Sequence, residues 1–333
     1  MRLGLAGVGR IGGSHAGVLK QHPDVESLVL ADADHVRAKE VAGRIGCESA
    51  GSVDELFDAG VDAVVIAAAT SAHADLLTRA SRAGLPAFCE KPIAGTVDET
   101  LAVIGEVKRS GVPVQIGFMR RFDAGYRTAR ERLRSGALGE LHRVHMVTCD
   151  PAPPPAEYIS TSGGLFRDCH IHDFDIMRWV TGVDAVEVYA RGANRGADYF
   201  RDAGDVDNAA ALLSLADGTL ATLQGSRYNG GGYDVRMELA GSAATYAVGL
   251  DQKMAVASAE PGETYPGGTP WQNFWERFTP AYRAEINAFI DLVKGEIDNP
   301  CTVDEALEAL WVAEAADRSL HEGRPVRVDE VRQ

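Results

Sequence analysis

The sequence predicts an α/β fold in two parts: a doubly wound parallel sheet, followed by an α+β domain with a mainly antiparallel, open sheet. Strand-like and helix-like segments alternate from residue 1 to about 120, and strand-like runs lie close together between residues 185 and 248. A glycine-rich turn also joins the first strand to the first helix. Repeated strand–helix units imply right-handed crossovers and parallel strands. We therefore expect domains at 1–120 and 121–333.

The first part contains several short apolar runs that are typical of buried strands. The run at 61–67 is rich in β-branched residues and does not alternate, as expected of a parallel strand buried on both faces. Thr70 to His73 should cap the helix that follows, and Lys91 should be extended or cis because it precedes Pro92. We expect strands at 3–6, 28–31, 61–67, 87–89 and 112–116, and helices at 12–19, 35–45, 70–84 and 100–108.

The second part changes in character after about residue 120. The segment 141–148 alternates as a half-buried strand should, and the proline-rich stretch 150–155 predicts a stiff, polyproline-like loop. Short turns such as 216–218 join neighbouring strand-like runs, which favours antiparallel pairing. We expect helices at 124–135, 173–181, 281–294 and 303–321, and further strands at 185–190, 208–215, 219–226, 233–240 and 245–248.

Composition limits the class of protein. With 45% hydrophobic and 24% charged residues the chain is typical of soluble globular proteins, and no run approaches the roughly 18–20 apolar residues of a membrane span. The net charge of −15, without a dense basic block, argues against a nucleic-acid partner. Five widely spaced cysteines without a CxxC motif favour reduced thiols. Because the N-terminus also lacks the order of a signal peptide, we expect a cytoplasmic protein.

A dinucleotide-binding motif follows the first strand. Gly7 permits a tight turn, Gly9 lets the backbone approach a pyrophosphate, and Gly12 lets the helix lie close to the strand. Asp32, twenty residues past Gly12, ends the next apolar run and could accept both hydroxyls of a ribose while repelling a 2′-phosphate. This pattern predicts a Rossmann domain that binds NAD. Two alternatives stay open: a glycine turn in another kind of α/β domain, and a phosphate bound by Arg37.

Ligands of such sheets bind at the carboxyl ends of the strands, where a helix N-terminus receives the phosphates. Every motif named so far falls at such an end, so one edge of the sheet should collect them. The candidates for contacts with the cofactor are Gly7, Gly9, Arg10, Ile11, Gly12, Asp32, Arg37, Ala67, Thr70, His73, Glu90, Lys91 and Met119.

Two clusters could carry chemistry. Lys91, at a strand end, could hold a substrate oxygen and stabilise negative charge that develops there, although it could also be a surface lysine in a turn. Asp168 and His172 share one face if the segment is helical, and a carboxylate that orients an imidazole is a common acid–base unit. A metal site built on His170 and His172, or solvated histidines at a helix N-terminus, are the alternatives.

These motifs, in their order and spacing, resemble the Gfo/Idh/MocA family of sugar oxidoreductases. The resemblance covers nearly the whole chain and is carried by residues 7–12, Asp32, Glu90-Lys-Pro92, residues 117–123 and the Gly163-Gly-Leu-Phe-x-Asp168-x-x-x-His172-Asp-x-Asp motif. The proline-rich loop that ends in Glu157-Tyr158 is most similar to the inositol 2-dehydrogenase branch. Two departures, Met119 where asparagine is common and His170 where threonine or glycine is usual, fall near the expected substrate pocket.

The resemblance implies a function and a set of roles. An NAD-dependent dehydrogenase of this kind would oxidise a secondary ring hydroxyl of a cyclic polyol, with Lys91 and His172 handling protons and Asp168 between them. The second domain's open sheet would mediate a homo-oligomer, often a tetramer. A dehydrogenase for another sugar, a cofactor-binding regulator and a metal hydrolase are the alternatives. The implied contacts with the polyol are Lys91, Asp150, Tyr158, Asp168, His172 and Tyr233, and no metal is expected.

Overall fold

The computed structural model describes residues 1–332, which form two compact units. The first unit comprises Met1–Met119 and Pro280–Leu307, and the second comprises Arg120–Thr279 and the residues from Glu308 on. The sequence places the boundary close to residue 120, but by contacts the segment from Pro280 to Leu307 belongs with the first unit. The assignment of separate functions to the two units stays a prediction.

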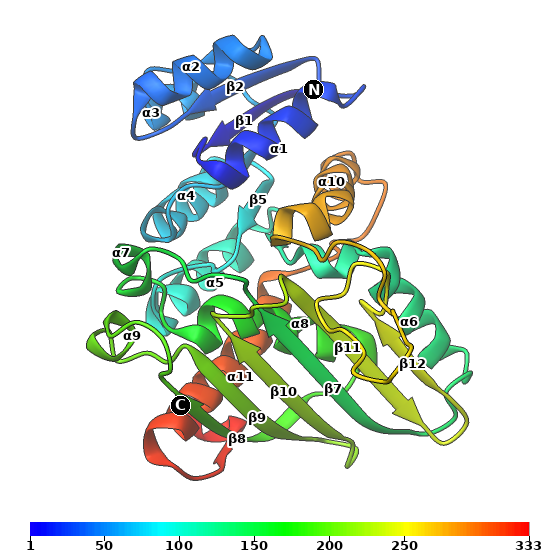
Figure 1. The fold of residues 1–333 in the computed structure, drawn as a ribbon. Coiled ribbons are helices and arrows are strands. Elements are labelled where there is room, and N and C mark those ends of the chain that lie inside the picture. The colour runs from blue at the N-terminus through cyan, green and yellow to red at the C-terminus, as the bar shows by residue number, and fades with distance from the viewer. Residues whose placement is uncertain (333) are drawn as a thin grey trace. The chain divides into compact units, whose positions relative to one another are not determined.

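The first unit is built on a six-stranded sheet in the order β3-β2-β1-β4-β5-β6 (Figure 1). Every neighbouring pair in it is parallel, and the order of the strands reverses between β1 and β4. The strands are β1 (Arg2–Ala6), β2 (Ser27–Ala31), β3 (Glu48–Ser49), β4 (Ala63–Ile66), β5 (Ala87–Glu90) and β6 (Val114–Gly117). The helices between them are α1 (Arg10–Gln21), α2 (His35–Ile45), α3 (Val53–Asp58), α4 (Thr70–Arg82) and α5 (Val97–Ser110).

Apolar residues of β1 and β2 form the core of the first unit together with part of α10 (Phe274–Val293). Leu3 and Leu30 are fully buried in this cluster, as is Phe289 from α10. Helix α10 begins earlier than the predicted residue 281 and contains Pro280. A proline lacks one helix hydrogen bond but does not always end a helix, so the sequence predicted this helix start too late.

The second unit contains a seven-stranded sheet in the order β12-β11-β7-β10-β9-β8-β13. Among the described residues its neighbouring strands pair antiparallel, except for β7 and β10, which are parallel. The prediction of a mainly antiparallel sheet is therefore confirmed, with one parallel pair at its centre. The strands are β7 (Leu141–Cys149), β8 (Ala185–Ala193), β9 (Asn208–Leu215), β10 (Leu220–Ser226), β11 (Asp234–Gly241), β12 (Thr245–Val248) and β13 (Val326–Arg327).

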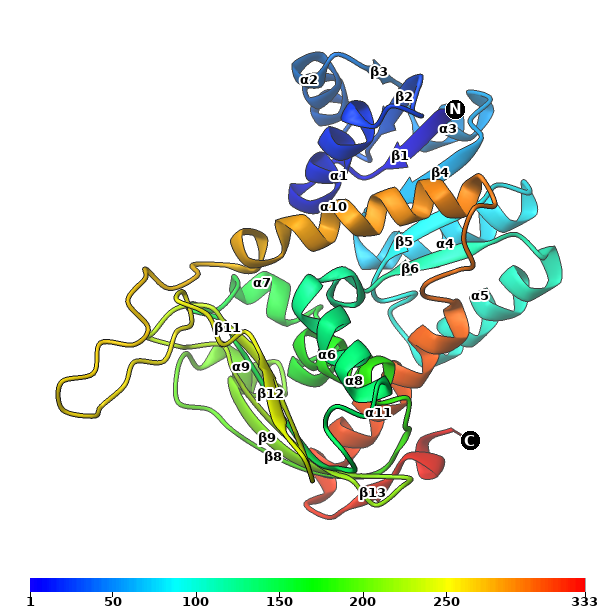
Figure 2. The ribbon, with the colours of Figure 1, turned by 90° about the vertical axis from the view of Figure 1, so that its right-hand side faces the viewer.

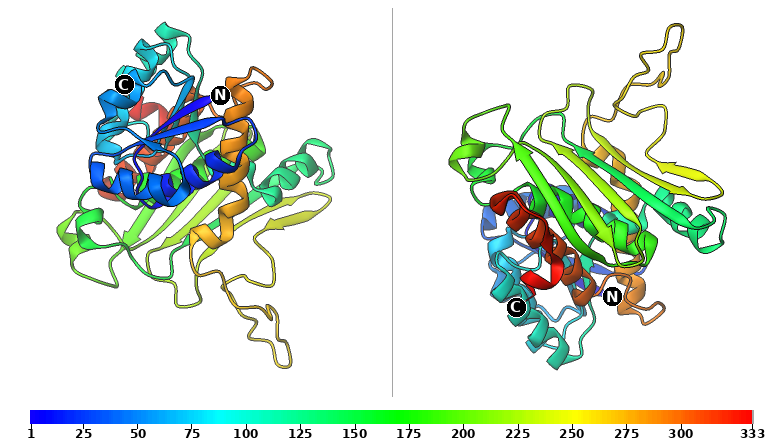
Figure 3. Two further views of the ribbon diagram at one scale, coloured as in Figure 1. Left: turned by 90° about the horizontal axis from the view of Figure 1, so that it is seen from above. Right: turned by 90° about the horizontal axis from the view of Figure 1, so that it is seen from below.

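Helices cover one face of this second sheet. Figure 2 shows α6 (Ala124–Arg134), α8 (Ile171–Thr181) and the later part of α11 (Val303–Glu322) on that face. The strands are seen from the opposite face in Figure 3, right panel, and within residues 1–332 no helix lies over β7, β9 and β10 there. Shorter helical segments are η1 (Met119–Phe122), α7 (Ala156–Ile159), a π-helix at Phe166–His170, α9 (Tyr199–Asp202) and η3 (Val328–Val331).

Some local predictions were wrong. Thr70 does not cap α4: the N-cap residue is Ala69, which has no side-chain oxygen, and Thr70 is the first helical residue. The short elements β3, α3, α7 and α9 were not predicted, because elements of two to six residues leave little periodic signal. None of the helices within residues 1–332 has the length and apolar character that crossing a membrane would require.

Candidate functional site

The predicted motifs of the first unit gather at one edge of its sheet. Gly7 follows β1, Asp32 follows β2 and Ala67 follows β4. Glu90 and Gly117 are the last residues of β5 and β6. Because all these strands are parallel, their carboxyl ends meet at the same edge, as the sequence predicted.

The glycine turn has the geometry that its motif implies. Gly7 has a φ of +93°, and a Cβ added there would lie 2.4 Å from the backbone of Ala68. A Cβ added to Gly12 would lie 1.9 Å from the carbonyl oxygen of Gly7, so α1 could not approach β1 with any larger residue. A Cβ on Gly9, by contrast, would meet nothing within 4 Å. The backbone at Gly9 therefore faces open space, which suits the close approach of a pyrophosphate.

Helices α1 and α4 differ from the other helices of this sheet at their N-termini. Side chains cap α2, α3 and α5, through Asp34, Ser52 and Thr96. No side-chain hydrogen bond caps α1 or α4, whose N-cap residues are Gly9 and Ala69. These two helices follow β1 and β4, the neighbours between which the strand order reverses. Helix ends without caps offer N–H donors and positive dipole ends to a phosphate, so the residues present fit a dinucleotide.

Asp32 is an ionised carboxylate at the end of β2. It accepts hydrogen bonds from the backbone N–H groups of Val8 at 2.7 Å and Asp34 at 2.9 Å, and from Arg37 Nη2 at 2.6 Å. Burial raises the pKa of Asp32, but the hydrogen bonds from Arg37 and the backbone outweigh it and hold this pKa below its usual value. The structure thus pairs Arg37 with Asp32, and an ionised acceptor stands where ribose hydroxyls are expected.

Two histidines hold the turn that carries Lys91. His15 Nε2, on α1, lies 2.7 Å from Glu90 Oε1, and His73 Nδ1, on α4, lies 2.7 Å from the carbonyl oxygen of Pro92. The Lys91–Pro92 peptide bond is cis, one of the two predicted geometries. Both neighbours of Lys91 are therefore fixed to a helix. The sequence did not predict the role of His15, although its position one turn past Gly12 on α1 could have suggested it.

The remaining cofactor candidates lie at the same edge, and their contacts with a cofactor stay predictions. Arg10 and Ile11 form the first turn of α1, and Ala67 and Thr70 lie just before and at the start of α4. Met119 is the first residue of η1 and is buried.

In the second unit, the parallel pair β7–β10 brings distant residues together. Cys149 pairs with Ser226 at the ends of these strands, so the next residues, Asp150 and Arg227, lie side by side. The backbone N–H of Asp150 donates to the carbonyl oxygen of Ser226 at 2.9 Å. The antiparallel strand β11 adds Tyr233, which precedes the residue paired with Cys149. Two of the predicted polyol contacts, Asp150 and Tyr233, thus lie with Arg227 at one end of the sheet.

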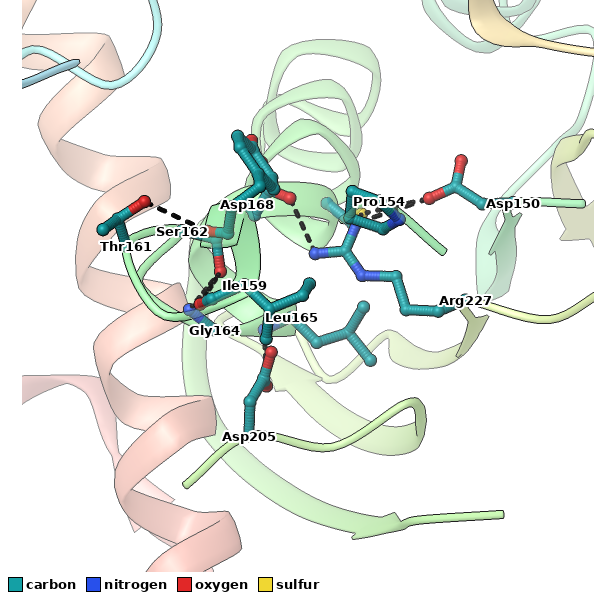
Figure 4. A network of polar contacts seen from close by, with 12 residues as sticks. Asp150, Pro154, Ile159, Thr161, Ser162, Gly164, Leu165, Asp168, Asp205 and Arg227 are labelled. Atoms are coloured by element: carbon teal, nitrogen blue, oxygen red, sulfur yellow. Dashed lines mark hydrogen bonds and ion pairs between the residues drawn. The ribbon is translucent and has the colours of Figure 1, made fainter. Parts of the chain in front are cut away.

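Arg227 links Asp150 to the Asp168 segment (Figure 4). Its Nη2 donates to Asp168 Oδ2 at 2.6 Å, and its Nη1 lies 3.3 Å from Asp150 Oδ2 and 2.8 Å from Cys169 Sγ. The hydroxyl of Tyr158 donates to the other oxygen of Asp168 at 2.8 Å. The structure therefore brings together Asp150, Tyr158 and Asp168, three of the proposed polyol contacts, and adds Arg227, which the sequence did not suggest. Their contact with a polyol stays a prediction.

Asp150 and Asp168 share the guanidinium of Arg227. Burial and the nearby charge of Asp168 raise the pKa of Asp150, and Arg227 offsets only part of this rise. Loss of water around the hydroxyl and the charge of Asp168 raise the pKa of Tyr158, so this phenol stays protonated and donates. Burial likewise raises the pKa of Tyr233.

Asp168 lies in a π-helical turn rather than in an α-helix. The π-helix Phe166–His170 leads into α8, which carries His172. The wider π-turn changes which side chains are aligned, so the α-helical spacing used to pair Asp168 with His172 does not apply across it. Single π-turns of this kind are frequent at functional sites. The orientation of His172 by Asp168 stays a prediction.

A second arginine–carboxylate cluster fixes the start of α8. The guanidinium of Arg120 donates to Asp173, which also accepts from Thr148 Oγ1 at 2.8 Å. Arg121 donates to Asp175 from Nη2 at 2.6 Å and from Nε at 3.0 Å. All four charged side chains are at most 2% exposed. These residues belong to motifs that carry the family resemblance, but their pairing was not predicted.

His170 is part of the same cluster and is fully buried. Its Nδ1 lies 2.8 Å from Asp173 Oδ2, and its ring packs so closely on Gly225 that a Cβ there would lie 1.9 Å from Nε2. Within residues 1–332, no group of three or more histidine, cysteine or acidic residues is placed to hold a metal ion.

The class of protein follows from these features. A parallel sheet with a reversal of strand order, two uncapped helices and an ionised carboxylate beside a glycine turn define a dinucleotide-binding fold. Residues 1–118 match an oxidoreductase family with an NAD-binding Rossmann fold, and residues 126–247 match the GFO/IDH/MocA C-terminal domain. The chain belongs to this GFO/IDH/MocA family, as the sequence motifs predicted.

Relatives extend the match over the whole chain. An inositol 2-dehydrogenase of Rhizobium meliloti is 36% identical, over 98% of this chain and 99% of the relative. A myo-inositol 2-dehydrogenase of Thermotoga maritima is 35% identical, over 99% of each chain. The crystal structure of scyllo-inositol dehydrogenase from Lactobacillus casei, with bound NAD(H) and scyllo-inositol, is 28% identical and covers 99% of each chain with a TM-score of 0.89.

Proposed function

We propose that this protein is an NAD-dependent dehydrogenase that oxidises a secondary ring hydroxyl of a cyclic polyol, myo-inositol or a close relative, to a ketone. The observation that carries the proposal is the cluster of Asp150, Tyr158 and Asp168 around Arg227. A ring that bears many hydroxyl groups needs several fixed donors and acceptors, and this cluster offers them from three separate segments. The full-length similarity to inositol dehydrogenases supports the same substrate class.

In the proposed reaction His172 takes the proton of the substrate hydroxyl as general base. Lys91, whose turn is held by His15 and His73, stabilises the negative charge that develops on that oxygen. Asp168 keeps His172 in the tautomer that can accept the proton. Bound NAD would supply the acceptor for the hydride. The residues that would hold it are the glycine turn, the N-terminal ends of α1 and α4, and Asp32.

The polyol itself would be held by Asp150, Tyr158 and Tyr233, together with the three catalytic residues. Asp150 and Asp168 accept hydrogen bonds from ring hydroxyls, and the tyrosine hydroxyls can both donate and accept. A dehydrogenase for an aldose or an aminosugar would share the cofactor site and differ in this substrate set. A non-catalytic NAD-binding regulator would have no use for Lys91 and His172.

The test is the formation of NADH, followed by absorbance, across a panel of inositols, hexoses and aminosugars. We expect turnover with at least one inositol, and the compound with the highest kcat/KM identifies the preferred polyol. Turnover only with an aldose or an aminosugar would replace the proposed substrate class. Binding of NAD without turnover on any member of the panel would favour the regulator.

Lys91→Ala and His172→Ala should each lower kcat by about two to four orders of magnitude, the usual size of an acid–base contribution. The affinity for NAD should stay nearly unchanged. Lys20→Ala, at the opposite end of α1 from the glycine turn, and His142→Ala, on the exposed part of β7, are the matched controls. If either catalytic variant kept the turnover of the controls, its assigned role would be wrong.

Asp32→Ala should weaken the binding of NAD and relax the discrimination against NADP, because the carboxylate that would repel a 2′-phosphate is gone. The ratio of kcat/KM for the two cofactors measures this. An unchanged ratio would remove Asp32 from cofactor selection.

We further propose a cytoplasmic homo-oligomer, a tetramer, formed through the open face of the second sheet. Tyr189, Leu212 and Leu220 are 37%, 46% and 51% exposed on strands β8, β9 and β10. Exposed apolar side chains at alternate positions of a sheet favour a covered face.

Light scattering after size exclusion should give four times the mass of one chain, and Leu212→Glu should lower that mass. A monomeric wild-type protein would contradict the proposal.

A further inference from the structure

Arg227 occupies a place that neither the motifs nor the proposed reaction explains. It is the first residue after β10, and its backbone N–H donates to the carbonyl oxygen of Asp207 at 2.7 Å. Its side chain is only 3% exposed. From this buried position one guanidinium reaches Asp150, Asp168 and Cys169, which come from two segments of the chain. These side-chain contacts are not required for β10 to end at this point, so they need another explanation.

The three charged side chains of this cluster differ in how far they are exposed to solvent. The side chain of Arg227 is almost completely enclosed, whereas Asp168 is 11% and Asp150 is 25% exposed. The arginine therefore lies behind the two carboxylates, and the carboxylates are the groups that solvent or a ligand can reach. Arg227 is placed to hold them and not to meet the substrate itself.

The charge balance shows what the arginine contributes. Arginine stays protonated at any pH that a protein tolerates, and its planar fork fixes carboxylates in direction as well as in charge. Without it, Asp150 and Asp168 would lose the guanidinium that lies between them, and the repulsion between the two carboxylates would favour uptake of a proton by one of them. A protonated or displaced Asp168 could no longer orient a catalytic imidazole.

We propose that Arg227 is a positioning residue of the dehydrogenase: its guanidinium fixes Asp168, which acts on His172, and at the same time fixes Asp150, which binds the polyol. The inference rests on the proposed function, because it acts through residues that take part in that reaction. Arg227 exchanges no proton and touches no reacting atom. Its effect is to couple the acid–base unit to the substrate contact through one rigid group.

The experiment compares Arg227→Ala, Arg227→Lys and wild-type protein in steady-state turnover of the best polyol. We expect Arg227→Ala to lower kcat about 10²-fold, the size of the loss that a displacement of about 1 Å can cause, and to raise the KM for the polyol. The KM for NAD should not change, since the cofactor contacts lie in the first unit. Arg227→Lys keeps the charge without the fork and should recover part of kcat.

Chemical rescue separates positioning from a general loss of folding. Free guanidinium at low millimolar concentration should raise the kcat of Arg227→Ala, and should not raise that of wild-type protein or of the control Arg201→Ala, whose exposed side chain pairs with Asp198. Arg227→Ala with wild-type kcat and KM would overturn the inference. Arg227→Lys with wild-type kcat and KM would overturn it as well. This second variant provides the test if Arg227→Ala does not fold.

The two proposals fail in different ways. If wild-type protein forms no NADH with any polyol, the proposed function fails, and the inference fails with it. If wild-type protein is active and the Arg227 variants match it, the inference alone is wrong. Loss of kcat in Arg227→Ala without any rescue by guanidinium or by lysine would mean that Arg227 only supports the fold.

Discussion

The second unit holds two arginine–carboxylate clusters that differ in charge balance. In one, Arg120 pairs with Asp173 and Arg121 with Asp175, so that each carboxylate has its own cation and all four side chains are dry. In the other, Arg227 pairs with both Asp150 and Asp168, and the two carboxylates remain partly exposed. The first cluster fixes the start of α8, whereas the carboxylates of the second are partly open to solvent, as the proposed contacts with a polyol require.

The pKa directions follow the same division. Burial raises the pKa of Asp173, but Arg120 and His170 outweigh it and hold this pKa below its usual value. Burial raises the pKa of Asp150, and here the shared arginine does not outweigh it. A carboxylate with a lowered pKa stabilises the folded state near neutral pH, whereas one with a raised pKa destabilises it. The difference agrees with a structural role for Asp173 and with the proposed role of Asp150 in binding the polyol.

The largest effect should come from breaking the first cluster. Asp173→Ala leaves Arg120 buried without its counter-charge, so we expect a loss of about 3–5 kcal/mol in the free energy of unfolding. Urea denaturation measures it. Asp184→Ala, which removes the partner of the half-exposed Arg178, is the matched control and should cost at most about 1 kcal/mol. Equal losses in the two variants would show that the first cluster does not anchor the unit.

The pH dependence of stability should report on the same carboxylate. The folded-state pKa of Asp173 is lowered, so its stabilising contribution is complete above the unfolded value of about 3.9 and is lost as the pH falls below it. Below that pH, the free energy of unfolding of the wild-type protein should fall by up to about 1.4 kcal/mol more per pH unit than that of Asp173→Asn, because the amide takes up no proton there. Urea denaturation at a series of pH values measures both slopes. Parallel slopes would contradict the assignment.

The smallest change in stability, with a clear change in function, should follow from Asp150→Asn. Because the folded-state pKa of Asp150 is raised, its ionised form opposes folding at neutral pH, and the amide should leave stability unchanged or raise it by about 0.5–2 kcal/mol. The KM for the polyol should rise about tenfold, since a charged acceptor is lost. Thermal unfolding and steady-state kinetics test the two parts. A destabilised variant with an unchanged KM would mean that Asp150 belongs with the structural acids.

The sequence predicted those features that local signals encode. The glycine turn, Asp32 and the strand ends of the first unit depend on residues close in sequence and on the regular path of a parallel sheet, and all lie where the motifs place them. For the same reason the sequence limited Lys91 before Pro92 to an extended or a cis geometry, of which the structure has the cis one.

The features that the sequence missed depend on contacts between distant segments. Arg227 carries no motif, and its place beside Asp150 follows only from the parallel pairing of β7 with β10. The contact of His15 with Glu90 joins α1 to β5, and the π-turn at Asp168 breaks the α-helical spacing that the sequence suggested. For Arg227 and His15 the deciding information is which strand or helix is the neighbour, and local patterns do not contain it.

The most direct test of the proposed reaction is a single-turnover measurement of NADH formation from myo-inositol that carries deuterium at the carbon to be oxidised. Transfer of a hydride from that carbon should slow the appearance of NADH relative to the unlabelled polyol, and the deuterium should be recovered in the reduced cofactor. NADH that appears at the same rate and carries no deuterium, or no NADH from either polyol, would contradict it.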